Sequence, residues 1–156
     1  MKTDIQIRPL LERDIEDILQ LTSRYAEFDL PNWRDRPSFE QAQKELHQAD
    51  IYCLEEQSKH FVAIDTNQLF LGYIYIGISV DFFTKETQGF IKSLAVTKQA
   101  EGRGVGMKLL DFAETWSRKQ GLKTIVLNVF ANNSRAKTRY ERAGYQAETI
   151  KYVKPL

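Results

Sequence analysis

The sequence predicts a single α+β domain over residues 1–156, with a mixed, mostly antiparallel sheet flanked by helices. One strand and two helices come first, antiparallel strands follow, and the chain ends as strand, helix, strand, helix, strand. Because a helix connects residues 89–96 to residues 124–130, these two strands are expected to pair in parallel. A length of 156 residues, with 42% hydrophobic and 28% charged residues, is typical of one globular domain with a core of its own.

The first part of the chain is predicted to form one strand and two helices. Alternating apolar residues indicate a strand over residues 4–8, which Pro9 ends. Apolar residues at spacings of three and four indicate an amphipathic helix over residues 12–28. Ser38 and Gln41 fit a capping box, so we expect a second helix to begin at Ser38.

The middle of the chain is predicted to form an antiparallel hairpin. Its two strands are residues 61–65 and 69–80, with a turn at Asn67 and Gln68. The preceding residues, 51–57, are ambiguous between helix and strand. They contain Cys53, the single cysteine, which we interpret as a core residue and not as an acyl carrier.

The second half is predicted to contain five elements in alternation. In order, these are a strand over 89–96, a helix over 104–120, a strand over 124–130, a helix over 133–143 and a final strand over 145–153. Gly121 and Gly144 follow the two helices, and glycine commonly ends a helix.

Composition and charge narrow the classes of function. No run of about 18 apolar residues and no apolar leader segment is present, so we expect a cytoplasmic protein that does not span a membrane. Two histidines and one cysteine make a metal site unexpected. Residues 1–65 carry 8 Lys+Arg against 14 Asp+Glu, and residues 66–156 carry 14 against 7. The basic second half suits a polyphosphate ligand and the acidic first half a cationic one, unless the asymmetry is chance. The basic residues lack the interleaved aromatic residues typical of nucleic-acid-binding surfaces, so we expect no nucleic-acid partner.

The glycines at 102, 104 and 106 form the stretch most indicative of function. They separate the apolar end of a predicted strand from a predicted helix. A helix start offers unpaired N–H groups, and glycines let a phosphate approach the backbone closely. Lys98, Arg103 and Lys108 add positive charge nearby. The stretch therefore predicts an anion site, although a glycine-rich connector that binds nothing remains an alternative.

Two common nucleotide-binding motifs do not fit this stretch. A Walker loop requires Gly-Lys-[Ser/Thr] after four intervening residues, but Met107 lies five residues after Gly102. A dinucleotide fingerprint requires its third glycine one residue later than Gly106, and a carboxylate after the next strand. The sequence supplies neither.

The stretch resembles motif A of the GNAT superfamily of N-acetyltransferases. Residues 99–104 satisfy [Q/R]-x-x-G-x-[G/A]. A second register, R-G-x-G-[IV]-G-x-x-L-L, matches Gly102, Gly104, Val105 and Gly106 together with Leu109 and Leu110, and we prefer it because it also matches the helix. This register places Glu101 where the family usually has Arg or Gln.

A second block, residues 133–145, resembles motif B of the same family. It reads N-x-x-A-x-x-x-Y-E-x-x-G-[FY], beginning at Asn133 and with its first tyrosine at Tyr140. Together the two motifs, with a strand between them, resemble the GNAT fold over nearly the whole chain. The resemblance implies that the parallel strand pair is central and splays apart near Val96 and Phe130.

The resemblance implies a coenzyme A site in that opening. Backbone groups of Leu94 and Val96 would pair with the pantetheine arm as an added strand does, and residues 101–106 would hold the pyrophosphate. Asn133 would hydrogen-bond the cofactor arm, or cap its own helix, or both. The implied cofactor-binding residues are Leu94, Ala95, Val96, Glu101, Gly102, Arg103, Gly104, Val105, Gly106, Met107, Asn133, Arg135 and Ala136.

The resemblance also implies the chemistry. Tyr140 would be the general acid, because a phenol of pKa about 10 can protonate a departing thiolate. Lys92 and Ser93 occupy positions where many members carry acidic residues, so the resemblance does not identify the general base that deprotonates the amine. Asp81 and Glu86 are candidates by proximity in sequence. A backbone N–H near Val96 could polarise the thioester.

The implied function is transfer of an acetyl group from acetyl-CoA to a primary amine, by direct transfer in a ternary complex. The acceptor would lie against the N-terminal helices, near Tyr25, Phe28, Asp29 and Trp33, whose aromatic and acidic side chains suit a cationic amine. A non-catalytic acyl-CoA-binding or regulatory module is the alternative, and another acyl donor remains open. Homodimers are common in the family.

Overall fold

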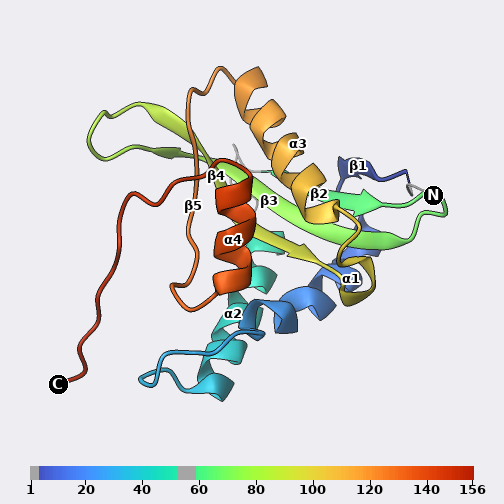
Figure 1. Ribbon diagram of the computed structural model, residues 1–156. Helices are drawn as coiled ribbons and strands as arrows, with labels where there is room; N and C mark the ends of the chain where they lie inside the picture. Colours follow the sequence, from blue (N-terminus) through green and yellow to red (C-terminus); the bar gives the residue numbers. More distant parts are fainter. Residues whose placement is uncertain (1–3, 53–58) are drawn as a thin grey trace.

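A computed structural model describes residues 4–52 and 59–156, which form a five-stranded mixed sheet (Figure 1). The strand order is β1 to β5, and every neighbouring pair is antiparallel except the parallel pair β4–β5. The bounds are β1 Gln6–Pro9, β2 Lys59–Ile64, β3 Phe70–Val80, β4 Thr87–Val96 and β5 Ile125–Leu127. The predicted mixed, mostly antiparallel fold with a parallel strand pair is confirmed. The pair was expected at the centre of the sheet but lies at its edge, because no described residue after β5 adds a further strand.

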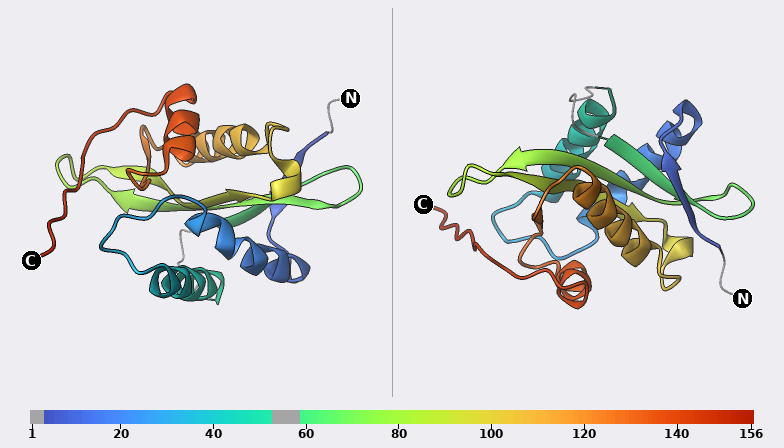
Figure 2. Two further views of the ribbon diagram at one scale, coloured as in Figure 1. Left: turned by 60° about the horizontal axis from the view of Figure 1, so that its bottom comes forward. Right: turned by 90° about the horizontal axis from the view of Figure 1, so that it is seen from above.

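Within the described residues, four α-helices cover the two faces of the sheet. They are α1 Ile15–Gln20, α2 Arg36–Tyr52, α3 Val105–Lys119 and α4 Ser134–Arg142. Figure 2 shows α1 and α2 on one face and α3 and α4 on the other. Each face has its own buried cluster. The α3 side is built on Leu71, Ile74, Ile76, Ile91, Leu109 and Leu110, and the α1–α2 side on Ile18, Leu21, Ile51, Val62, Tyr73 and Tyr75.

A β-bulge at Lys92 exchanges the two faces of β4. Ile91 pairs with Ile76 and Ser93 pairs with Tyr75, so Lys92 is an extra residue in the ladder. Before the bulge the odd-numbered residue Ile91 packs in the cluster on the α3 side, and after the bulge the even-numbered residue Val96 packs in that cluster. Ser93 thereby faces α2, which positions it in the site described below.

The parallel strands pair over only three residues and then separate. Gly89, Phe90 and Ile91 of β4 are paired with β5, but β4 continues to Val96 without this neighbour. Thr97 donates its N–H to Leu71 on the opposite side, at an N–O distance of 2.9 Å. Because strand residues alternate, the backbone groups of Leu94 and Val96 point into the opening between β4 and the chain after β5.

The single helix expected over residues 12–28 was wrong. The segment contains a 3-10 turn at Glu12–Asp14, the short α1, and a longer 3-10 stretch at Leu21–Ala26. The hydroxyls of Thr22 and Ser23 donate to backbone carbonyls three residues earlier, at 2.8 and 3.4 Å. Such local bonds compete with the α-helical pattern and accompany its tightening here.

The second helix begins earlier than the capping box predicted. The α2 helix starts at Arg36, and Asp35 caps it by accepting hydrogen bonds from the Ser38 N–H at 3.0 Å and the Ser38 hydroxyl at 2.6 Å. Ser38 is therefore the third helical residue and not the cap.

The last two predicted strands also differ from the structure. The strand expected over 124–130 has only three residues, and residues 145–153 form no strand. The chain leaves α4 at Gly144, where φ is +92°, and runs away from the sheet (Figure 1), so its alternating pattern meets no partner. Tyr152 is accordingly 89% exposed. Cys53 and most of the ambiguous segment 51–57 lie outside the described residues. In the described ranges, no helix has the length and apolarity needed to cross a membrane.

Candidate active site

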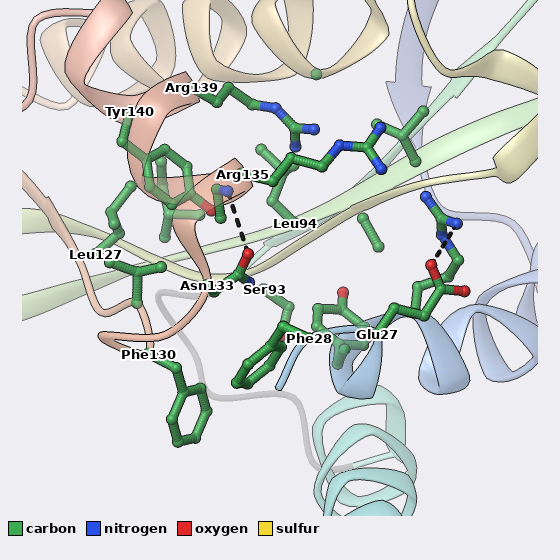
Figure 3. Close-up of a pocket in the computed structure, with 18 of the residues that line it drawn as sticks. Glu27, Phe28, Ser93, Leu94, Leu127, Phe130, Asn133, Arg135, Arg139 and Tyr140 are labelled. Atoms are coloured by element: carbon green, nitrogen blue, oxygen red, sulfur yellow. Dashed lines mark hydrogen bonds and ion pairs between the residues drawn. The ribbon is translucent and has the colours of Figure 1, made fainter. Parts of the chain in front are cut away.

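A cleft of about 1320 Å³ runs through the opening beside β4. It is lined by β4, the start of α3, α4, the segment after β5, the 3-10 stretch Leu21–Ala26 and α2. Figure 3 shows Arg135, Arg139 and Tyr140 extending from α4 over Leu94 of β4, with Phe28 and Phe130 together at one end. Of the thirteen residues predicted to bind cofactor, all but Arg103 line this cleft.

One end of the cleft is rich in unpaired backbone donors. Gly102 and Gly104 have φ of +74° and +80°, a left-handed conformation that favours glycine. Within the described residues, no acceptor pairs with the N–H groups of Gly102, Gly104 and the first three residues of α3. Arg139 of α4 stands over this helix start, since a Cβ added to Gly106 would lie 3.5 Å from its side chain. Donors and positive charge of this kind fit a diphosphate.

Glu101, the departure from the family motif, is held by two arginines. Arg135 contacts it at 2.8 and 3.0 Å, and Arg24 from the opposite side of the cleft also pairs with it. Arg24 in turn contacts Glu27 at 2.7 Å. Hydrogen bonds from Arg135 and then Arg24 lower the pKa of Glu101 to about 2, so the carboxylate is charged but its charge is matched. The repulsion that a lone carboxylate would exert on an anionic ligand is thereby offset.

The two motif B residues of interest both come from α4 or its cap. Asn133 caps the helix, because its side-chain oxygen accepts from the Ala136 N–H at 3.2 Å. The capping role that the sequence left open is therefore observed, and the residue also lines the cleft. Burial raises the pKa of Tyr140, which keeps its hydroxyl protonated and able to donate at neutral pH.

A buried polar cluster, which the sequence reasoning missed, lies across the cleft from α4. His47 of α2 is 2% exposed, and its Nε2 lies 3.3 Å from the Ser93 hydroxyl on β4. Its Nδ1 lies 2.6 Å from the backbone carbonyl of Gln43, and its ring lies 4.2 Å from that of Tyr25. The signal in the sequence was spacing, since His47 precedes buried Ile51 by one helical turn.

Three phenylalanines from separate segments pack together at the far end, where two of them, Phe28 and Phe130, line the cleft. The ring centroids of Phe28 and Phe39 lie 5.2 and 5.3 Å from that of Phe130. Asn132 ties the same segments together by donating to the Asp29 carbonyl at 3.0 Å. Of the predicted acceptor residues, Tyr25, Phe28 and Asp29 line the cleft, whereas Trp33 does not and is 47% exposed.

The two carboxylates considered as bases from the sequence lie elsewhere. Asp81 and Glu86 belong to the turn between β3 and β4, and neither lines the cleft. Asp81 accepts from the backbone of Thr84 at 2.7 Å and that of Phe83 at 3.0 Å. These bonds lower the pKa of Asp81, which is what a turn-forming side chain shows.

Comparisons with known proteins agree with this geometry. The profile of the Acetyltransferase (GNAT) family matches residues 15–145. The uncharacterized N-acetyltransferase YhfO of Bacillus subtilis is 24% identical over 147 residues, covering 93% of this chain and 92% of its own length. N-alpha-acetyltransferase 30 of Schizosaccharomyces pombe is 33% identical over 85 residues, 54% of this chain and 55% of its own.

A solved structure is similar over the full length. A Pyrococcus furiosus protein assigned as an acetyl transferase superposes with a TM-score of 0.77 at 30% identity, covering 98% of this chain and 100% of its own. The match spans both motifs, the mixed sheet and the helices on its two faces. The chain therefore belongs to the acetyltransferase (GNAT) family.

Proposed function

We propose that this protein transfers an acetyl group from acetyl-CoA directly to a primary amine, with both substrates bound at once. The observation that carries the proposal is a single cleft that joins the unpaired edge of β4 to the donors at Gly102–Met107 and to a wall of aromatic and acidic side chains. Tyr140 lines the stretch between them. Two substrates can then meet without a covalent enzyme intermediate.

The residues present fit coenzyme A. Its diphosphate would accept from the free N–H groups at the start of α3, with Arg139 and Arg135 nearby. Its pantetheine arm would lie along β4 and pair with the backbone of Leu94 and Val96, as an added strand does. This placement would bring the thioester toward the segment of β4 that Tyr140 and Ser93 also line.

The chemistry would follow from this placement. The amine nitrogen attacks the thioester carbonyl carbon, and the negative charge that develops on the oxygen is stabilised by a backbone N–H of β4. When the carbon–sulfur bond breaks, Tyr140 donates its proton to the thiolate. Burial, which raises the pKa of Tyr140, ensures that the proton is present at neutral pH.

A cationic acceptor suits the other end of the cleft. Asp29 lines it together with the rings of Phe28 and Phe130, and such a setting favours an alkylammonium. The resemblance to an N-alpha-acetyltransferase adds peptide N termini to the acceptor classes to be tried. We would screen polyamines, lysine derivatives, aminoglycosides and short peptides.

A non-catalytic acyl-CoA-binding module is the second candidate. It is favoured by one observation, namely that Lys92 and Ser93 stand on β4 where many family members carry a carboxylate.

Thermal unfolding with acetyl-CoA, CoA, NAD and ATP tests the site. At about 100 times the dissociation constant a ligand adds roughly 2.7 kcal/mol of stability, a Tm shift on the order of 5–10 °C. A shift with the CoA compounds alone supports both candidates. Release of free thiol that depends on an added amine supports the enzyme, and binding without turnover of any amine supports the module.

A further inference from the structure

We propose that Ser93 and His47 form the proton relay that receives the proton from the acceptor ammonium. The inference rests on the proposed acetyl transfer and assigns the base that this transfer needs. The ammonium must lose a proton before its nitrogen has a lone pair for attack. Among the described residues, no carboxylate of β4 lines the cleft, and Asp81 and Glu86 lie outside it.

The hydrogen-bond partners fix the direction of the relay. The Gln43 carbonyl can only accept, so the His47 Nδ1, 2.6 Å away, carries the ring proton. The Nε2 then has its lone pair free and faces the Ser93 hydroxyl at 3.3 Å. Ser93 donates to His47, which leaves the oxygen of Ser93 able to accept a proton from the cleft side, directly or through one water.

The surroundings keep His47 neutral. Burial lowers the pKa of His47, an effect that the Gln43 carbonyl and Asp50 of the same helix oppose. Tyr25 from the 3-10 stretch and Ser93 from β4 face the ring from the other elements. A neutral imidazole is available as a base at pH 7, and the reverse transfer readily clears its proton after each turnover.

Tyr25 places a buried phenol ring beside the imidazole of His47, with ring centroids 4.2 Å apart. Its hydroxyl is buried and has no hydrogen-bond partner within the described part of the chain. Burial raises the pKa of Tyr25, and an interaction with Ser93 partly offsets the rise. Because Tyr25 remains protonated, it can donate to Ser93 while Ser93 passes its own proton to His47.

The other buried histidine shows what a purely structural role looks like. His60 engages both ring nitrogens, with Tyr73 at 2.6 Å and the Asp50 carbonyl at 3.0 Å, and it does not line the cleft. Its ring stacks on Tyr75 at 3.9 Å. His47, in contrast, has one nitrogen directed through Ser93 toward the cleft.

The proton count closes. The ammonium gives one proton to Ser93 as Ser93 gives its own to Nε2 of His47, and the neutral amine attacks the thioester. The second nitrogen proton restores Tyr140 after Tyr140 has protonated the thiolate. The sum is an amide, a free thiol and one proton that leaves from His47 to solvent.

The test compares pH profiles of kcat/KM for an acetylated amine in the wild type and in Ser93→Ala and His47→Gln. With the relay, the wild type shows a plateau that begins below pH 6.5 and extends toward the pKa of the ammonium. Without it, only the free amine reacts, so each variant should rise about tenfold per pH unit over the same range. We expect a loss of about 100-fold at pH 7. A plateau retained in both variants overturns the relay.

A weakly basic acceptor sharpens the comparison. Trifluoroethylamine is already neutral at pH 8 and needs no base. With this amine, the kcat/KM of Ser93→Ala should therefore approach that of the wild type. An equal loss for both amines overturns the proposal. Ser93→Thr, which keeps the hydroxyl, should recover part of the plateau, and His60→Gln is the matched buried-histidine control that should keep it.

Nitrogen NMR of the histidine rings tests the relay independently of turnover. If no amine is acetylated, the proposed acetyl transfer fails, but the NMR result still decides whether the hydrogen-bonded relay exists. The proposal expects a proton on Nδ1 of His47, a bare Nε2, and a shift of both the tautomer balance and the midpoint of titration in Ser93→Ala. A proton on Nε2, or a His47 signal unaffected by Ser93→Ala, overturns it.

Discussion

Arg135 holds Glu101 with both terminal nitrogens, Nη1 at 3.0 Å from Oε1 and Nη2 at 2.8 Å from Oε2. This fork joins the first turn of α4 to the residue before the glycine turn, and Arg24 holds the same carboxylate from the other wall of the cleft. A charge that looked unfavourable for an anion site in the sequence thus organises two cationic side chains around it.

Glu101→Gln should tighten acetyl-CoA binding modestly. Removing one negative charge near the diphosphate leaves Arg24 and Arg135 with a net positive field, worth about 2- to 5-fold in affinity for charges several ångströms apart in water. Calorimetric titration at low and moderate salt measures the change, which screening should reduce at the higher salt. Weaker binding at low salt would show instead that Glu101 serves mainly to position the arginines.

Gly104→Ala should weaken acetyl-CoA binding and lower stability. Its φ of +80° costs an alanine about 1 kcal/mol. Gly104 also lines the cleft where the diphosphate is proposed, so an added methyl group would compete with that ligand for space. Gly121→Ala is the matched control, because Gly121 has φ of +76°, equally open surroundings and no place in the cleft. We expect both variants to lose the same amount of Tm, but only Gly104→Ala to lose affinity for acetyl-CoA. If both variants bind acetyl-CoA equally well, the glycine turn is not part of the site.

Tyr140→Phe should lower kcat by about 100-fold and leave the dissociation constant for acetyl-CoA nearly unchanged. The substitution removes the proton donor but keeps the ring. Tyr145→Phe is a close control, since its ring centroid lies 6.0 Å from that of Tyr140 and its buried hydroxyl has no partner within the described residues, but it does not line the cleft. Single-turnover kinetics with each variant separates chemistry from binding, and a large affinity loss with unchanged kcat would contradict the assigned role.

The free energy of unfolding should fall as the pH drops from about 6.5 to 4. Burial lowers the pKa of His60 to about 4 and also lowers that of His47, whereas both titrate near 6.5 in the unfolded chain. In this window the unfolded state binds more protons, so acidification favours unfolding. Urea unfolding at several pH values measures the slope, which His60→Gln should reduce. An unchanged slope in that variant would mean that other groups set the acid sensitivity.

The parts of the site that are local in sequence could be predicted, and those that depend on distant pairs could not. The glycine turn and the Asn133 cap follow from spacings of a few residues, and the structure has both where expected. His47 and Ser93 are 46 residues apart, and Arg24 and Glu101 are 77 apart, so no periodicity relates them. The final strand failed for the same reason, because alternation shows which residues could face a core but not whether a partner strand exists.

The single extra residue at Lys92 makes the pairing register of β4 a functional property. From Thr87 to Ile91, odd-numbered side chains of β4 face the α3 side of the sheet. After the bulge, even-numbered side chains face that side instead. If Lys92 were instead paired in an unbroken ladder continued from Thr87, the Ser93 hydroxyl would turn toward the apolar layer beneath α3, while Leu94 and Val96 would turn toward α2. A strand of the same length without the bulge would thus present the inside of the protein to the substrate.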